Sequence, residues 1–242
     1  MGVVLAIDTV AGASSVALGS ATQLKASVEI REPKPAASLM PVIAQVLERG
    51  GCDVGELSCV LVANGPGSFT GIRVGFATAI GMIRQHPGIQ LWTAPSLMAV
   101  AFRVAQQRGE TIAALYDALR GEVFAAVYEF TEKGVTTLLP PKLTSIEELQ
   151  ATGVVPTLVT GDGAAAFAEQ IEAWTGRPPV HSADRLSLAE SLIKLTGVSG
   201  GISVVADPTC FEPTYGRLAE AQVRWEQAQG RPLPSPLGSR KK

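Results

Sequence analysis

The sequence Gly65-Pro66-Gly67-Ser68-Phe69-Thr70-Gly71 separates two apolar stretches, residues 58–63 and 72–83. The first is short and continuous, which is typical of a buried strand, and the second is long enough for a helix. Ser68 or Thr70 can cap that helix. A glycine-rich turn entering a helix presents free N–H groups, so the loop is either an anion cradle or a turn that packs closely against a neighbouring strand or partner. The sequence leaves both interpretations open.

Three common motifs do not fit this loop. A Walker A loop needs a Lys after its last glycine, and none follows Gly71. The dinucleotide fingerprint G-x-G-x-x-G is missed by one residue. A nucleophile elbow, G-x-S-x-G, fails because Pro66 and Thr70 stand two positions from Ser68.

Composition limits the classes of function. Hydrophobic residues make up 46% of the 242 residues and charged residues only 17%, which suggests apolar surface reserved for a partner. The net charge of −2 gives no global attraction to nucleic acid. We find no membrane-spanning stretch and no signal peptide. The three cysteines have no C-x-x-C spacing and are expected to be buried thiols in a reducing cytoplasm. His86 and His181 are too far apart to suggest a metal site.

The chain order repeats once. Residues 3–7 form an apolar run that ends at Asp8-Thr9, and two strands are expected at 14–18 and 24–30. A helix follows from residue 37 to the Gly50-Gly51 stop, then the 58–63 strand, the glycine loop and its helix, a strand at 88–93 and a helix at 95–108. An Asp at a strand end usually caps a turn.

The second half repeats this order of strands and helices and is followed by two further helices and a tail. An apolar run ends at Asp117, strands follow at 122–129 and 135–139, then a helix at 145–151 and a strand at 156–160. The turn at 161–163 leads into a helix at 164–174. Helices are also expected at 187–196 and 219–227, and residues 228–242 are predicted to be a disordered tail.

A duplicated α/β half led by a β-hairpin is the plan of the actin-like (ASKHA) fold. The sequence therefore predicts two related subdomains, residues 1–108 and 109–227, each with a mixed sheet.

The first two long helices are unusually apolar. Helical spacing predicts that one face of each is apolar, and the second helix is apolar all round. Either this surface meets another chain, or the helix is sandwiched between the sheet and other helices. The interface residues that we predict are Leu39, Val42, Ile43, Val46, Leu47, Ile72, Phe76, Ile80 and Ile83. Arg73 opposes the helix dipole, so it needs an anion, either a carboxylate such as Asp8 or a bound phosphate.

Several stretches resemble the TsaB (YeaZ) family. They are residues 5–9 with 15–18, the glycine loop followed by Ile72-Arg73-Val74-Gly75, Ser96-Leu97, and Asp117-Ala118 with 121–124. Weaker matches are residues 161–163 and 213–215, so the resemblance extends to about residue 215. Many relatives have a His just before the first helix, where this chain has Arg31-Glu32-Pro33-Lys34-Pro35, which weakens any role for that loop.

The resemblance implies an actin-like fold and a part in making threonylcarbamoyladenosine next to the tRNA anticodon. It implies a non-catalytic subunit that binds a TsaD-type transferase, with a TsaE-type ATPase as a further partner and a homodimer when alone. The family makes these contacts through the first two helices. Contact with tRNA is expected only through the complex.

Two other functions remain open. An ATP-binding phosphotransferase or ATPase would use Asp8 or Asp117 with magnesium and the glycine turns on phosphates. The anion-binding or nucleotide-binding residues would be Asp8, Thr9, Gly65, Gly67, Ser68, Thr70, Gly71, Arg73 and Asp117. A hydrolase would pair Ser68 with a His, although the elbow spacing is missing. We predict no catalytic residue, metal or cofactor, with weak nucleotide binding left open.

Overall fold

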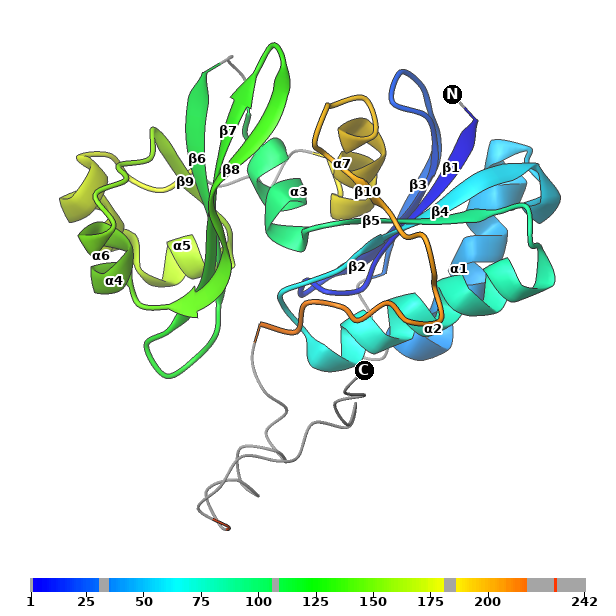
Figure 1. The fold of residues 1–242 in the computed structure, drawn as a ribbon, viewed down its shortest axis with the longest axis horizontal. Helices are drawn as coiled ribbons and strands as arrows, with labels where there is room; N and C mark the ends of the chain where they lie inside the picture. Colours follow the sequence, from blue (N-terminus) through cyan, green and yellow to red (C-terminus); the bar gives the residue numbers. More distant parts are fainter. Residues whose placement is uncertain (1, 31–34, 106–108, 181–185, 217–228, 230–242) are drawn as a thin grey trace, which may run out of the picture.

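The computed structural model describes residues 2–30, 35–105, 109–180, 186–216 and 229. Two sheets lie beside each other, and each carries its own helices (Figure 1). The first sheet has the strand order β10-β5-β4-β1-β2-β3. Its strands are β1 (Val3–Asp8), β2 (Ser14–Gly19), β3 (Leu24–Ile30), β4 (Leu57–Ala63), β5 (Gln90–Ala94) and β10 (Ser203–Val204). The leading hairpin β1–β2 is antiparallel, and β1, β4 and β5 run parallel, so the sheet is mixed as predicted.

Each face of the first sheet carries helices. On one face, α1 (Pro35–Gly50) and α2 (Phe69–Gln85) cover the side chains of Leu5 and Ile7. A Cβ on Gly75 of α2 would lie 4.0 Å from Ile7, which fixes this face. On the opposite face lies α7 (Leu188–Leu195), where Ala189 N donates to Ser15 Oγ at 3.0 Å. Because side chains alternate along a strand, Asp8 points to the α7 face together with its cross-strand partner Ser15.

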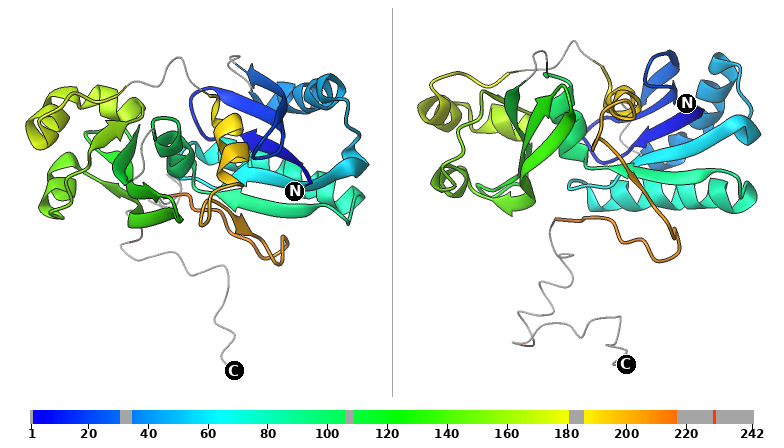
Figure 2. Two further views of the ribbon diagram at one scale, coloured as in Figure 1. Left: turned by 90° about the horizontal axis from the view of Figure 1, so that it is seen from above. Right: turned by 45° about the horizontal axis from the view of Figure 1, so that its top comes forward.

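The second sheet has the order β8-β7-β6-β9, with β6 (Glu110–Asp117), β7 (Val123–Thr131), β8 (Gly134–Thr144) and β9 (Leu158–Thr160). One face packs on α4 (Ile146–Ala151), α5 (Asp162–Ala166) and α6 (Ala168–Thr175) through side chains such as Leu115 and Ile171. The other face, with Ile112 and Tyr128, joins the core of the first subdomain. The helix α3 (Ser96–Phe102) lies between, against β6, β7 and α7 (Figure 2). One core cluster therefore extends from the first subdomain to the inner face of the second sheet, and a second cluster lies between that sheet and its own helices.

The predicted division of the chain needs a correction. Residues 109–227 were assigned to the second subdomain, but α7 packs on β1 and β2 and β10 pairs with β5, so the chain returns to the first sheet after residue 186. The amphipathic pattern of α7 buries Leu192 and Ile193 on that sheet, and the sequence pattern does not say which sheet receives a helix. Residues 219–227 and the predicted tail at 228–242 lie outside the described residues, apart from residue 229.

Smaller differences have local causes. The helix predicted at 95–108 ends at Phe102, and the one at 164–174 is two helices that meet at Phe167. The strand predicted at 135–139 extends to Thr144, through the adjacent residues Pro140 and Pro141, which an edge strand tolerates. Cys210 is exposed, whereas Cys52 and Cys59 are buried as expected.

A segment near the C-terminal end of the described chain explains why α2 is apolar on several sides. Residues 205–216, here called the strap, run along α2 (Figure 1). Phe211 stacks on Phe76 with ring centroids 5.1 Å apart, and Tyr215 meets Phe69 at 4.8 Å. The sheet covers one side of α2 and the strap a second, so much of its apolar surface is used inside the monomer.

Candidate functional site

The glycine loop packs against the end of β1. Ser68 N donates to Val10 O at 3.0 Å, and Thr9 Oγ1 donates to Gly71 O at 2.6 Å. A Cβ on Gly71 would lie 1.8 Å from Thr9 O, and one on Gly67 would lie 2.4 Å from Val10 Cγ1. These contacts leave no room for a side chain, because real Cβ atoms do not approach other atoms within 3.0 Å.

The other side of the loop meets the strap. Thr214 N donates to Asn64 O at 3.0 Å, and a Cβ on Gly65 would lie 2.2 Å from Thr214 O. Ser96 Oγ donates to Pro66 O at 2.6 Å. Close packing therefore accounts for the glycines. An anion-binding role for Gly65, Gly67, Ser68, Thr70 and Gly71 stays a prediction.

Ser68 is the residue that caps α2. Its Oγ accepts a hydrogen bond from Gly71 N at 3.1 Å, as one of the two capping interpretations predicted. His86 caps the far end of the same helix, about 25 Å away at the usual rise of 1.5 Å per residue. Ser68 and His86 therefore do not form a nucleophile and base pair, and His181 lies outside the described residues.

Arg73 finds a partner that the sequence did not predict. Its guanidinium lies over the Phe69 ring, 3.9 Å from the centroid, and 5.7 Å from the centroid of Tyr215. The predicted partner Asp8 points to the α7 face of the sheet, away from α2. A cation–π contact therefore takes the place of the expected carboxylate.

Asp8 and Asp117 hold equivalent turns in the two halves. Asp8 Oδ1 accepts from Val10 N at 3.1 Å, and Asp117 Oδ1 accepts from Leu119 N at 2.7 Å. Both carboxylates therefore cap a turn, as expected for an Asp at a strand end. Their surroundings differ, because Asp8 is fully buried and Asp117 is exposed. Burial raises the pKa of Asp8 to about 7, against two backbone hydrogen bonds that lower it.

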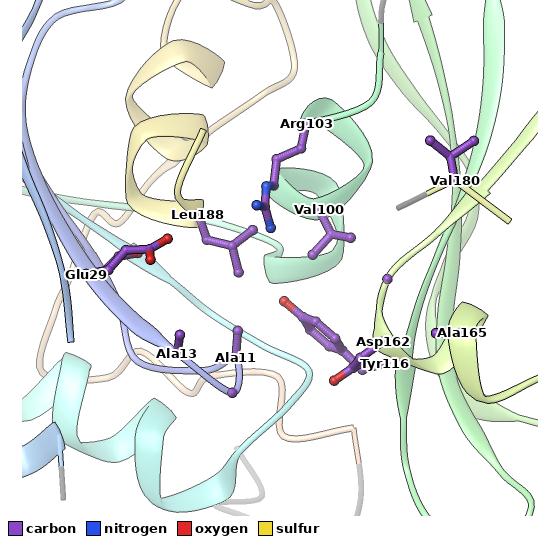
Figure 3. Close-up of a pocket in the computed structure, with 13 residues that line it drawn as sticks. Ala11, Ala13, Glu29, Val100, Arg103, Tyr116, Asp162, Ala165, Val180 and Leu188 are labelled. Carbon is purple, nitrogen blue, oxygen red and sulfur yellow. The ribbon is translucent and has the colours of Figure 1, made fainter. Parts of the chain in front are cut away.

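A cavity of about 360 Å³ lies between the two subdomains (Figure 3). The turn at residues 11–13 and Glu29 line it from the first sheet, and Tyr116, Gly161 and Asp162 from the second. Arg103, near the end of α3, lines it as well. Of the predicted anion-binding residues, none lines this cavity, since the glycine loop and Arg73 lie with α2 on the other face of the first sheet.

The sequence signals for this cavity were weak. Tyr116 reads as the last apolar residue of a strand, and Asp162 as part of a turn. The repeat of hairpin and glycine turn was the only sign that these segments face each other across the two halves.

Six of the nine predicted interface residues require a correction. Their side chains are buried within the monomer, that of Phe76 against Phe211 of the strap, and so cannot form an exposed surface: Leu39, Ile43, Val46, Leu47, Ile72 and Phe76. The remaining three, Val42, Ile80 and Ile83, are half-buried. Both helices still present small or apolar residues outward, among them Met40, which is 55% exposed.

Across the described ranges, His, Cys, Asp and Glu side chains do not gather in groups of three or more that could hold a metal ion. The predicted absence of a metal or cofactor stays a prediction. Within the same part of the chain, each helix is too short or too polar to cross a membrane.

Comparison with known proteins identifies the family. Residues 30–182 match the family model described as TsaD, tRNA N6-adenosine threonylcarbamoyltransferase. The chain is 30% identical over 167 residues to the tRNA threonylcarbamoyladenosine biosynthesis protein TsaB of Escherichia coli, covering 65% of this chain and 71% of that protein. It is 27% identical over 237 residues to the TsaB protein of Bacillus subtilis, covering 93% and 99%.

Solved structures agree on the fold. A Pseudomonas aeruginosa crystal structure, described as having similarity to peptidase YeaZ, is 24% identical with a TM-score of 0.66, covering 90% of this chain and 100% of that one. YeaZ from the same organism is 23% identical with a TM-score of 0.61, covering 81% and 91%. These likenesses confirm the actin-like fold predicted from the repeated order of elements. The chain belongs to the TsaB (YeaZ) family.

Proposed function

We propose that this chain takes part in threonylcarbamoyladenosine biosynthesis on tRNA as a non-catalytic subunit that binds and supports a TsaD-type transferase. The names of its relatives support the pathway. The observation that carries the docking role is the outer side of α1 and α2, here called the docking face. It comprises Met40, Pro41, Ala44, Ala77 and Gly81, with the half-buried Val42, Ile80 and Ile83 at its edges.

The docking face suits a packed helical contact. Met40 projects from α1 with 55% of its surface exposed, and a flexible apolar side chain of this kind fills irregular gaps. On α2, Ala77 is exposed and no atom lies within 4 Å of the position that a Cβ on Gly81 would take. Such small residues let the backbone of a partner helix approach closely. Burying Met40 and its neighbours would also remove exposed apolar area from water.

The same face can be shared by more than one partner. In the absence of the transferase, we propose that a second copy of this chain occupies it, which gives a homodimer. A TsaE-type ATPase would join the assembly at another surface, and tRNA would be contacted through the complex. Light scattering of the isolated protein over a range of concentrations tests the homodimer directly.

Binding to the TsaD-type transferase of the same organism tests the main proposal. Ala77→Asp and Met40→Asp place an unpaired charge in the contact, and we expect each to weaken binding at least about tenfold. Leu138→Asp is the matched control, because Leu138 is 39% exposed but lies on β8 of the second sheet. Val46→Asp is unsuitable, since Val46 is buried and its substitution would test folding.

Two results would overturn the proposal. One is a transferase that forms no complex with the wild-type chain, together with normal threonylcarbamoyladenosine levels in a deletion strain. The other is equal binding by Ala77→Asp, Met40→Asp and the Leu138→Asp control. Calorimetric titration with magnesium and ATP tests the alternative function of an ATP-binding phosphotransferase or ATPase. That alternative requires a measurable heat of binding at millimolar nucleotide.

A further inference from the structure

The Tyr116 side chain lines the cavity between the subdomains, and its hydroxyl makes no hydrogen bond to the described part of the chain. Tyr116 is 7% exposed and its hydroxyl is buried; the Ser96 hydroxyl, which donates to Pro66 O, lies near enough to offset part of the rise in the pKa of Tyr116. In Figure 3 the phenol reaches from the second sheet toward the centre of the cavity. An unpaired buried hydroxyl costs free energy, so a donor or acceptor that occupied the cavity beside it would be stabilised.

Carboxylates dominate the polar surroundings of that hydroxyl. Asp162 lines the cavity next to Tyr116, and Glu29 lines it from the first sheet. Asp8 is fully buried and near enough to raise the pKa of Tyr116, and its Oδ2 has no hydrogen-bond partner among the described residues. Burial and the charges of Asp8 and Asp162 together raise the pKa of Tyr116, which reflects how near these carboxylates are. Among the described residues that line this cavity, Arg103 is the one cation, and its charge lowers the pKa of both Asp8 and Tyr116 in part.

The Asp162 carboxylate is held in position before any ligand arrives. Its Oδ1 accepts from Asp117 N at 3.1 Å and from Gly163 N at 2.8 Å. Asp162 is exposed at the cavity wall, and partial desolvation of its carboxylate raises its pKa against the two backbone hydrogen bonds, which lower it. A positive ligand group at this wall would compensate the charge of the carboxylate, whereas a phosphate would be repelled.

We propose that this cavity binds a small compound carrying an ammonium group, which donates hydrogen bonds to the Tyr116 hydroxyl and the Asp162 carboxylate. The volume of about 360 Å³ is at the lower end of ligand pockets, which fits a small molecule. The ammonium supplies three donors for a site whose fixed groups are mainly acceptors. This site is separate from the docking face, which lies on the other side of the first sheet.

Three probes of similar size, one positive, one neutral and one negative, show which charge the site prefers. The full-length protein is titrated with propylammonium, 1-propanol and propionate, and binding is followed by two-dimensional amide NMR. We expect propylammonium to bind with a Kd in roughly the millimolar range for so few atoms, at least about tenfold tighter than the other two. The amide signals of Gly12, Gly161 and Asp162 should shift. Affinity should also rise with pH, because ionised carboxylates bind the cation better.

Variants test the two named contacts. Tyr116→Phe keeps the ring and removes the hydroxyl, and Asp162→Asn keeps an oxygen for the two amides and removes the charge. Each should weaken propylammonium binding by about tenfold while the remaining amide spectrum stays folded. Glu172→Gln is the matched control, because Glu172 is exposed on α6 and does not line the cavity.

Four results would refute the proposal. They are tighter binding of propionate than of propylammonium, unchanged affinity in Asp162→Asn, unchanged affinity in Tyr116→Phe, and no shift of the cavity amides with any probe. Binding to the transferase is measured separately with the same variants and should not change. Failure here would therefore leave the proposed function of the docking face standing.

Discussion

Gly71→Ala should destabilise the protein strongly, although the new side chain is a single methyl group. Gly71 lies in the first turn of α2, where the helix passes the end of β1. The added Cβ would lie 1.8 Å from Thr9 O, and the minimum is 3.0 Å, so the two backbones must separate by at least a further 1.2 Å. The neighbour is a carbonyl in a fully buried strand end, so no flexible side chain can make room.

The expected cost follows from the contacts that this separation breaks. Overpacking of this kind costs about 1–3 kcal/mol. Moving Gly71 also strains the bond from Thr9 Oγ1 to Gly71 O and the cap from Gly71 N to Ser68 Oγ, each worth about 1 kcal/mol. Alanine regains part of this through its higher helix propensity. We therefore expect a loss of about 3 kcal/mol in the free energy of unfolding.

Urea unfolding at low protein concentration measures this loss. Gly81→Ala is the matched control in the same helix, because no atom lies within 4 Å of its Cβ position. That change should stabilise the protein by about 0.5–1 kcal/mol through helix propensity alone. If both substitutions shift the midpoint in the same direction and by similar amounts, close approach to β1 is not the reason for the glycine at position 71.

Two further predictions concern Asp8 and the strap. The folded protein holds the Asp8 proton more tightly than the unfolded chain, so the wild-type free energy of unfolding should fall as pH rises from about 4 to about 7, by up to about 4 kcal/mol. Asp8→Asn should lack this slope, and urea unfolding of both proteins at pH 5 and pH 8 checks the difference; parallel curves would contradict it. Phe211→Ala should cost about 2 kcal/mol, because it removes the ring that stacks on Phe76, whereas Phe211→Leu should cost less. Equal stability of Phe211→Ala and wild type in urea would show that the strap does not hold α2.

The repeated order of elements was predictable because it rests on strong local signals. Asp8 and Asp117 end apolar runs, and in the structure each caps the turn of a leading hairpin. In both halves a glycine turn separates a strand from the helix that follows it. Element boundaries were harder to predict, because the sequence predicts one helix at 164–174 where the structure has two helices that meet at Phe167.

The features that could not be predicted depend on contacts between residues far apart in the sequence. The helical pattern at 187–196 is clear, but only the folded chain brings it back to the first sheet. The strap contacts of Phe211 and Tyr215 join residues more than 130 positions apart, and no local pattern encodes them. For that reason an apolar helix surface was interpreted as an interface when six of its nine predicted residues are core. Tyr116 and Asp162 were not predicted as residues of the cavity because they reach it from separate segments.

The two halves use their glycine turns in the same way, and this bears on where a ligand can bind. Gly161 approaches Leu115 O as Gly71 approaches Thr9 O, with Cβ positions 1.9 Å and 1.8 Å away. In both turns the neighbouring backbone therefore occupies the space beside the glycine. The cavity of about 360 Å³ lies instead between the subdomains. The second half contributes Tyr116 and Asp162 to that cavity, while the turn at residues 11–13 contributes only small residues. Substitutions of Tyr116 and Asp162, together with Glu29 and Arg103, should therefore control what the cavity binds, and substitutions in α1 and α2 should control which proteins the chain meets.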